Sequence, residues 1–386
     1  MKRMGFFAEM AGLIVLIVFF VSPAMCDGKE FKFGLTVPKS GWGAEEGVIE
    51  ENGAMLAVEE INAAGGIKGI PIKMYVYDNG SNPTQSINVG KKLIYEDKVI
   101  VILGPAFSSQ VEVTFPVANL GKTPIISALS SKPGISEKNR PWAFRNTMTS
   151  DKLYKSLVER WANDFKIKKV AIIYDAKDRF SQSDGTIVFP GALKELNIPI
   201  VTSVTYMTND MDFSAQLTAI QRFQPDGIII AGLRTEAAQI MKQARQKGMK
   251  TPFTGGLELV TPRFIELGGK DVEGTYIIHS MWISGNPDAK MVEFVEKVKK
   301  RTGKLANIGD LRMYDCVYIN KYVIEKMGVT GKPEDLEKDR DKIREGWKTL
   351  KDYQGVEGKM SIDEKGDGVK ENYLLVVKDG KFVRLH

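Results

Sequence analysis

The hydrophobic positions of this chain fall into two alternating patterns. Short runs are apolar at almost every position and rich in Val and Ile, whereas the longer segments between them are apolar only at helical spacing. Continuous apolar runs predict parallel strands buried on both faces, and the longer segments predict amphipathic helices. In the first part of the chain, strands are predicted at 31–37, 71–77, 99–103 and 125–127, and helices at 46–63, 83–94 and 111–120. This order is typical of a doubly wound parallel sheet.

The same pattern begins again near residue 147. After a helix that starts at Ser150, strands are predicted at 169–174, 198–206, 227–231 and 251–254, with helices between them. Further helices are predicted at 288–302, 310–327 and 332–351, and the tail forms a hairpin at 373–384. A chain of 386 residues is long enough for two domains. We therefore expect an α/β protein built from two such units.

Two hydroxyl-rich loops follow neighbouring predicted strands within the stretch 99–133. Ser108 and Ser109 come after the first of these strands and precede a helix, and Ser130 and Ser131 come after the second. Loops at the carboxyl ends of adjacent parallel strands are where open α/β sheets bind ligands, and hydroxyls at a helix start suit a carboxylate. The alternative is that these serines only cap helices. Their occurrence in two successive loops favours a shared small-ligand site.

The N-terminal segment has the pattern of an export signal. Lys2 and Arg3 precede a short apolar run at 11–21, and small residues suitable for cleavage follow before Cys26. The run is shorter than the roughly 20 residues of a membrane-spanning helix, which disfavours an uncleaved anchor. A lipid anchor on Cys26 is also disfavoured, because the preceding Pro-Ala-Met fits the lipoprotein pattern badly. We predict a signal peptide over 1–26 and a periplasmic mature protein.

Few residues in the chain are suited to catalysis or metal binding. There are two cysteines and two histidines. Cys316 lies in an apolar helical stretch and His279 in an apolar strand-like run, so both are expected to be structural. The net charge of 54 − 48 = +6 is spread over the chain without a basic block, which argues against nucleic-acid binding. The sequence therefore predicts no metal site, no cofactor and no disulfide framework.

Two further positions are candidates for a ligand cleft. Trp42 lies between glycines in the loop after the first strand. That loop lacks the G-x-G-x-x-G spacing, and an indole would crowd a pyrophosphate, so a cleft loop with an aromatic wall is the better interpretation. Glu258 follows a strand end in the second half of the chain. Its carboxylate is predicted either to meet a ligand ammonium across a cleft or to face solvent.

An ordered set of short motifs carries a family resemblance. The motifs are F-G-L-T-V-P-K-S-G at 33–41, G-A-M-L-A-V-E-E-I-N-A-A-G-G-I-K-G at 53–69, V-I-L-G-P-A-F-S-S at 101–109, D-F-S-A-Q-L at 212–217, P-D at 225–226, K-Q-A-R-Q-K-G at 242–248 and E-G at 273–274. Together with the export signal, they resemble the periplasmic leucine/isoleucine/valine-binding protein family of ABC importers. The resemblance covers nearly all of the mature chain.

The resemblance implies two doubly wound α/β lobes joined by three hinge crossovers, with the ligand in the interlobe cleft. The crossovers would fall near 145–149 and at 275–282 and 354–358. The first lobe would combine 30–146 with 283–353, and the second would combine 147–274 with 359–386.

Family members that bind amino acids imply roles for individual residues. Ser108, Leu129 through its backbone, and Ser131 would hold the α-carboxylate and α-ammonium, next to Ser130. Trp42 would line the side-chain pocket.

In the second lobe, Phe180 and either Leu233 or Arg234 match positions where the family has aromatic residues, typically tyrosines, and Glu258 matches the acidic partner of the ammonium. An arginine facing the cleft would favour a second acidic group on the ligand, which leaves a ligand other than a branched-chain amino acid open.

The predicted function is that of an exported solute-binding protein without catalysis. It would bind a small carboxylate-bearing solute, such as an amino acid or a relative, by hinge closure, and present it to the membrane permease of an ABC importer. One alternative is a ligand-sensing receptor module of the same fold. Others are a binder of a non-amino-acid aromatic acid or amide, and an enzyme, against which the scarcity of histidine and cysteine argues.

Overall fold

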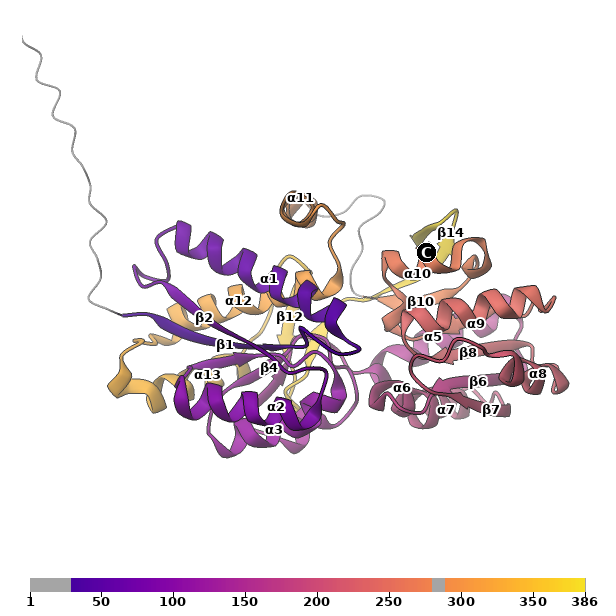
Figure 1. Ribbon diagram of the computed structural model, residues 1–386, viewed down its shortest axis with the longest axis horizontal. Helices are drawn as coiled ribbons and strands as arrows, with labels where there is room; N and C mark the ends of the chain where they lie inside the picture. Colours follow the sequence, from indigo (N-terminus) through magenta and orange to yellow (C-terminus); the bar gives the residue numbers. More distant parts are fainter. Residues whose placement is uncertain (1–28, 280–288, 386) are drawn as a thin grey trace, which may run out of the picture.

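The computed structural model describes residues 29–279 and 289–385, which form two α/β bodies side by side (Figure 1). The first contains a five-stranded parallel sheet in the order β2-β1-β3-β4-β5, and we call it the first lobe. Its strands are β1 (Phe31–Val37), β2 (Ile72–Asp78), β3 (Val101–Leu103), β4 (Ile125–Ser127) and β5 (Ala143–Arg145). Its helices are α1 (Ala44–Ala63), α2 (Pro83–Lys91), α3 (Ser108–Leu120), α4 (Ile135–Lys138), α11 (Ala289–Thr302), α12 (Ile308–Met327) and α13 (Leu336–Lys348).

The second body, which we call the second lobe, contains a seven-stranded sheet in the order β15-β14-β10-β9-β8-β6-β7. Its strands are β6 (Val170–Asp175), β7 (Ile200–Tyr206), β8 (Gly227–Ala231), β9 (Phe253–Gly255), β10 (Tyr276–His279), β14 (Tyr373–Lys378) and β15 (Lys381–Arg384). Its helices are α5 (Ser150–Phe165), α6 (Arg179–Ser183), α7 (Phe189–Glu195), α8 (Ser214–Arg222), α9 (Arg234–Gln246) and α10 (Pro262–Gly268). The sheet is parallel from β7 to β10, and β14 and β15 add antiparallel strands at its edge.

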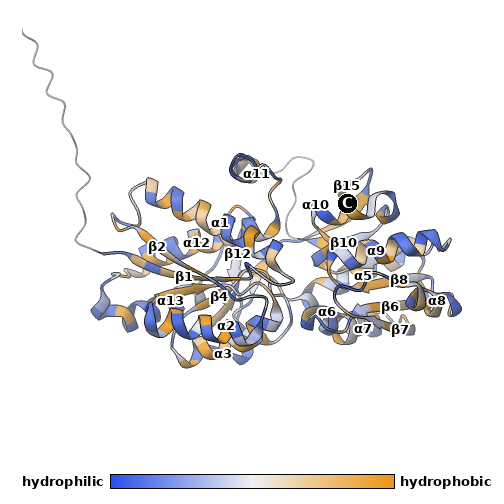
Figure 2. Cartoon of the chain, viewed as in Figure 1, coloured by the Kyte–Doolittle hydropathy of each residue, from blue (hydrophilic) through white to orange (hydrophobic). Residues whose placement is uncertain are grey.

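The continuous apolar runs form strands because helices cover both faces of each sheet. Successive residues of a strand point to opposite faces. In β8, Ile228 and Ile230 pack into a core with α8, α9 and α10, whereas Ile229 packs into a second core with α5 and α7. Figure 2 shows the hydrophobic colouring gathered on the inner strands of both lobes. The predicted α/β class with two parallel-sheet lobes is confirmed.

Two local predictions differ from the structure. β5 was not predicted as a strand, because Ala143–Arg145 contains no β-branched residue and ends in an arginine, so it does not form a continuous apolar run. The single helix predicted after β6 is divided into α6, a π-helical segment Asp184–Val188 and α7, with Pro190 in the first turn of α7. The three segments follow one another directly with right-handed helical angles at their junctions, so Pro190 lies in one continuous helical run, directly after its π-helical turn.

The chain passes between the lobes after β5, after β10, and between β13 and β14. The second passage lies partly within 280–288, outside the described residues. A small sheet of β11 (Tyr353–Gln354), β12 (Lys359–Ile362) and β13 (Gly368–Lys370) precedes the third. Met360 of β12 packs into the core of the first lobe. We therefore propose that the second lobe takes its share of the tail from β14 onward, and not from residue 359 as predicted.

The first and third passages are held against each other by buried polar contacts. Arg145 Nη2 lies 2.7 Å from Asp367 Oδ1, and both side chains are almost completely buried. The backbone of Gly368 donates to the carbonyl of Thr147 at 3.0 Å. Arg145 Nη1 also donates to the carbonyl of Ser130 at 3.2 Å, so the loop after β4 is held against the two passages.

Candidate ligand-binding cleft

The two serine loops of the first lobe meet through a side-chain hydrogen bond. Ser108, the first residue of α3, and Ser130, which follows β4, place their Oγ atoms 2.8 Å apart. Ser127 Oγ donates to the carbonyl of Pro105 at 2.7 Å and accepts from the Ser130 backbone N–H at 3.3 Å. The loops after β3 and β4 therefore form one unit, as their position at adjacent strand ends predicts.

The second serine loop is held mainly by its backbone, which leaves one hydroxyl without a partner. The Ser131 carbonyl accepts from the Ser150 N–H at 2.9 Å, and the Ser130 carbonyl accepts from Arg145 Nη1 at 3.2 Å. Ser131 Oγ is buried and has no hydrogen-bond partner among the described residues. A buried hydroxyl without a partner is unfavourable, so this atom is suited to a ligand.

Residues of both lobes line one cavity between them. The first lobe contributes Glu46, Ala106, Phe107, Ser108, Leu129, Ser130 and Ser131, and the second contributes Asp178, Phe180, Leu233 and Glu258. The structure thus brings together six of the predicted residues, namely Ser108, Leu129, Ser130, Ser131, Phe180 and Glu258. It adds Glu46, Phe107 and Asp178, which the sequence analysis did not single out.

Arg234 lies in a second cavity that shares a wall with the first. Glu46, Leu129 and Glu258 line both cavities, and Arg234 lines only the second. Arg234 Nη2 lies 2.7 Å from Glu46 Oε2. Because this pair compensates the guanidinium, the reason to expect a second acidic group on the ligand is removed. Leu233, the other candidate at this position, lines the first cavity.

Glu258 is an acidic residue that the second lobe contributes to the cavity. It lies in the 3-10 turn Leu257–Leu259 directly after β9, and burial raises its pKa to about 7 despite the opposing effect of Arg234. At neutral pH its charged and neutral forms are therefore both populated. A cation placed beside it would favour the charged form.

Asp178 caps α6 and also lines the cavity. Its Oδ2 accepts from the Ser181 N–H at 2.8 Å and from Ser181 Oγ at 2.7 Å. Its Oδ1 is buried without a partner among the described residues, and burial raises the pKa of the carboxyl. The Asp-x-x-Ser spacing could have revealed the cap, but nothing in the sequence reveals that the cap faces a ligand cavity.

Trp42 lies at the rim and not inside the first cavity. Its ring is 4.3 Å from that of Phe107, measured between centroids, and 38% of the residue is exposed. It lines an outer groove together with Asp178 and Arg179. Phe107, rather than Trp42, is the aromatic residue of the first lobe that lines the cavity.

Within the described parts of the chain, no group of three or more His, Cys, Asp or Glu residues is arranged to hold a metal ion. Over residues 29–279 and 289–385, no helix is long and apolar enough to cross a membrane.

A family model described as a periplasmic binding protein matches residues 30–381. The chain belongs to this family of periplasmic binding proteins. The predicted resemblance is confirmed, and with it the interpretation of the chain as a solute-binding protein. An "Amino acid binding protein" of Pseudomonas aeruginosa is 29% identical over 355 residues, which are 90% of each chain.

Solved structures of the periplasmic binding protein family have the same fold. A leucine-binding protein of Thermotoga maritima superposes with a TM-score of 0.82 at 26% identity, over 92% of this chain and 97% of that one. A branched-chain amino acid transporter substrate-binding protein of Streptococcus pneumoniae, in complex with isoleucine, gives 0.81 at 26% identity over 92% and 98%.

Proposed function

We propose that this protein binds an amino acid between its lobes and delivers it, chemically unchanged, to the permease of an ABC importer. Relatives in three species are named for binding amino acids, leucine and branched-chain amino acids, and one of them was solved with isoleucine. We also propose export to the periplasm by cleavage of the N-terminal segment, which lies outside the described residues.

One observation carries the proposal. The cavity has hydroxyl donors on one lobe and a carboxyl group on the other. Ser108 and Ser131 suit the α-carboxylate, helped by the N–H groups at the start of α3. Glu258 suits the α-ammonium, which would favour its charged form. An amino acid carries both groups on one carbon, so a single head group would bridge the two lobes.

The other residues that line the cavity indicate the polarity of the ligand's side chain. Phe107 and Leu129 of the first lobe face the same cavity as Phe180 and Leu233 of the second. These side chains are apolar, and the charge of Arg234 is compensated by Glu46. We therefore propose a neutral amino acid with an aliphatic or aromatic side chain, because these four apolar residues form the wall that such a side chain would contact.

Binding would act through closure of the lobes. The ligand touches both lobes only when they are together, so its binding free energy favours the closed form. Burial from both sides also requires that the lobes part for entry and release.

The test is a thermal-shift screen of the purified mature protein against the twenty amino acids, followed by titration calorimetry. A neutral aliphatic or aromatic amino acid should raise the melting temperature in a concentration-dependent manner. Its deaminated analogue, which keeps the carboxylate, should bind at least tenfold more weakly. Equal binding of both would contradict the assignment of Glu258 and favour an organic-acid binder. Recovery of the ligand unchanged after incubation tests the absence of catalysis.

Two variants test the two ends of the head group. Ser131→Ala should weaken binding through the carboxylate, and Glu258→Gln through the ammonium, each by about tenfold, as expected for losing a charge-assisted hydrogen bond. Ser156→Ala and Glu159→Gln serve as matched controls, because both positions lie on α5, outside the residues that line the cavity.

A further inference from the structure

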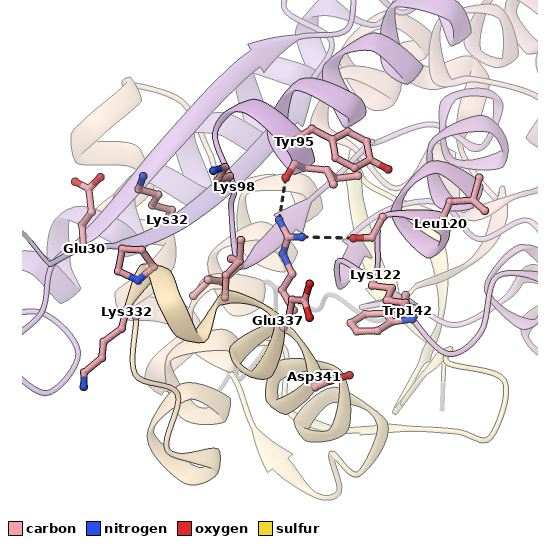
Figure 3. Close-up of a pocket in the computed structure, with 17 residues that line it drawn as sticks. Glu30, Lys32, Tyr95, Lys98, Leu120, Lys122, Trp142, Lys332, Glu337 and Asp341 are labelled. Carbon is pink, nitrogen blue, oxygen red and sulfur yellow. Dashed lines mark hydrogen bonds between the residues drawn. The ribbon is translucent and has the colours of Figure 1, made fainter.

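The first lobe has a second concave site at the opposite end of its sheet. The ligand loops follow the carboxyl ends of β3 and β4, whereas this second pocket is lined by residues at the amino ends of the strands. Ile100 directly precedes β3, Lys122 precedes β4 and Trp142 directly precedes β5 (Figure 3). Its volume of about 640 Å³ falls in the range of small-molecule sites. None of its lining residues lines the cleft cavities.

The pocket is surrounded by lysines that have no acidic partner. Four of its lining residues are Lys32, Lys98, Lys122 and Lys332 (Figure 3). None of their ammonium groups forms an ion pair with a described residue, although many other lysines of the chain do. They come from four separate segments of the chain and line one pocket only in the folded lobe, where the side chain of Lys332 points outward from its edge (Figure 3).

The acidic residues of the pocket do not cancel this charge. Glu30 lies 3.2 Å from Lys73, and Asp341 lies 3.0 Å from Arg344, so two of the three carboxylates are paired with cations outside the pocket. Glu337 is the third. The pocket therefore has a surplus of positive charge.

A buried guanidinium adds to that surplus. Arg340 is 7% exposed and donates only to backbone carbonyls, with Nε 2.9 Å from Val99 O and Nη2 3.0 Å from Ile94 O. A weaker contact of 3.4 Å joins Nη1 to Gly121 O. No carboxylate of the described residues forms an ion pair with it. Glu337, which lines the same pocket, stabilises the charge of Arg340 without forming an ion pair with it, and an anion bound in the pocket would be stabilised by the guanidinium as well.

Apolar surface lies beside the charges. Leu120 is 81% exposed and Tyr95 is 58% exposed, and both line the pocket together with the buried Ile94 and Ile100. Exposed large apolar side chains next to a concave site mark ligand-binding surfaces more often than isolated ones do. The pocket thus offers an apolar wall as well as cations.

We propose that this pocket binds a small amphipathic anion, with an acidic head group and an aliphatic or aromatic body. The carboxylate, sulfonate or phosphate head meets the lysines and Arg340, and the body covers Leu120 and Tyr95. This site is separate from the cleft and does not depend on the function proposed for it.

Fluorescence titration with 8-anilinonaphthalene-1-sulfonate, which is both anionic and apolar, tests the proposal. We expect saturable binding at one site, weakened by added salt because three of the four lysines are exposed. Dodecanoate below its micelle concentration should displace the probe. The uncharged 1-anilinonaphthalene should bind at least fivefold more weakly.

Two of the lysines can be replaced without straining the backbone. Lys98 and Lys122 have φ angles of 55° and 45°, and asparagine tolerates this left-handed region well, so Lys98→Asn with Lys122→Asn removes charge while keeping the turns. This double variant should weaken probe binding at least fivefold. Lys166→Asn is the matched control, with φ 55° on the second lobe, and should bind as the unaltered protein does.

Equal probe affinity in the double variant and the control would overturn the proposal, as would the absence of saturable binding. Ser131→Ala in the cleft should leave probe binding unchanged, and a loss there would place the probe in the cleft instead. All variants are compared at unchanged melting temperature, which keeps loss of the fold apart from loss of the site.

Discussion

Arg234 and Glu46 form an ion pair across the cleft, with Nη2 2.7 Å from Oε2, and each residue lies in the first turn of a helix in a different lobe. Glu46 lies in the first turn of α1, where the helix dipole favours an acid, whereas Arg234 is the first residue of α9, where the dipole disfavours a cation. The pair therefore explains why an arginine is tolerated at the start of α9. It also makes closure of the lobes partly independent of the ligand.

Removing the arginine should weaken ligand binding. Arg234→Met leaves Glu46 without its cation and removes a contact that joins the two lobes. We expect the affinity for the amino acid found in the screen to fall about tenfold, equivalent to about 1.4 kcal/mol, because lost closure energy is subtracted from binding. Titration calorimetry measures the affinity, and small-angle X-ray scattering should show a larger radius of gyration for the ligand-free variant.

A double-mutant cycle separates this pair from general effects on the site. Glu46→Gln combined with Arg234→Met should lose less affinity than the sum of the two single variants. Additive losses would mean that the two side chains do not act on each other in solution, and the pair would have no role in closure.

The affinity for an amino acid should fall as the pH is lowered from 8 to 6. Burial raises the pKa of Glu258 to about 7 in the ligand-free cleft, and a ligand ammonium would lower it again by favouring the carboxylate. Above pH 7 the group is already charged, whereas below pH 7 it must lose a proton on binding. The dissociation constant should therefore rise by up to tenfold per pH unit below 7.

Titration calorimetry in buffers of different ionisation enthalpy measures both the affinity and the proton release. Glu46 and Asp178 line the same cavity, and burial raises their pKa values as well. Glu258→Gln identifies the group responsible, because its pH profile should be flat between 6 and 8. A profile that keeps the slope of the unaltered protein would assign the titration to one of the other two acids.

The ion pair between Arg145 and Asp367, which joins the first and third passages, should contribute to the free energy of unfolding. Arg145→Met leaves Asp367 buried without its partner, since both side chains are at most 2% exposed. Breaking such a pair costs about 3–5 kcal/mol, which urea unfolding should detect. Lys155→Met breaks the exposed pair with Glu195 and is the control, for which no measurable change is expected. Similar stability of both variants would show that the pair between Arg145 and Asp367 contributes no more than a surface pair.

The sequence allowed the fold and one wall of the cleft to be predicted, for a clear physical reason. Buried parallel strands leave continuous apolar runs, and the serine loops follow two such runs directly, so Ser108 and Ser130 were found from local pattern alone. Phe107 and Asp178 were missed because their local roles, before a helix and as a helix cap, are the same in any protein. Glu46 and Arg234 are 188 positions apart, and only the arrangement of the two lobes in the folded chain brings them together.

A glycine in α1 sets the distance between two helices of the first lobe, and this gives the sharpest test of its packing. A Cβ added at Gly53 would lie 2.0 Å from the carbonyl oxygen of Asp310 in α12, so α12 would have to move away. Alanine has a higher helix propensity than glycine by about 1 kcal/mol, but the clash with backbone should outweigh it. We expect Gly53→Ala to destabilise the protein by about 1–3 kcal/mol.

Gly191 in α7 supplies the matched control for this substitution. A Cβ there would meet no atom within 4 Å, and the residue is exposed inside a helix. Gly191→Ala should therefore stabilise the protein by about 0.5–1 kcal/mol, through reduced backbone entropy of the unfolded chain. Urea unfolding of both variants measures the two opposite changes. If Gly53→Ala were also stabilising, α1 and α12 would not be in the close contact described, and the position of Glu46 at the start of α1 would need to be revised with it.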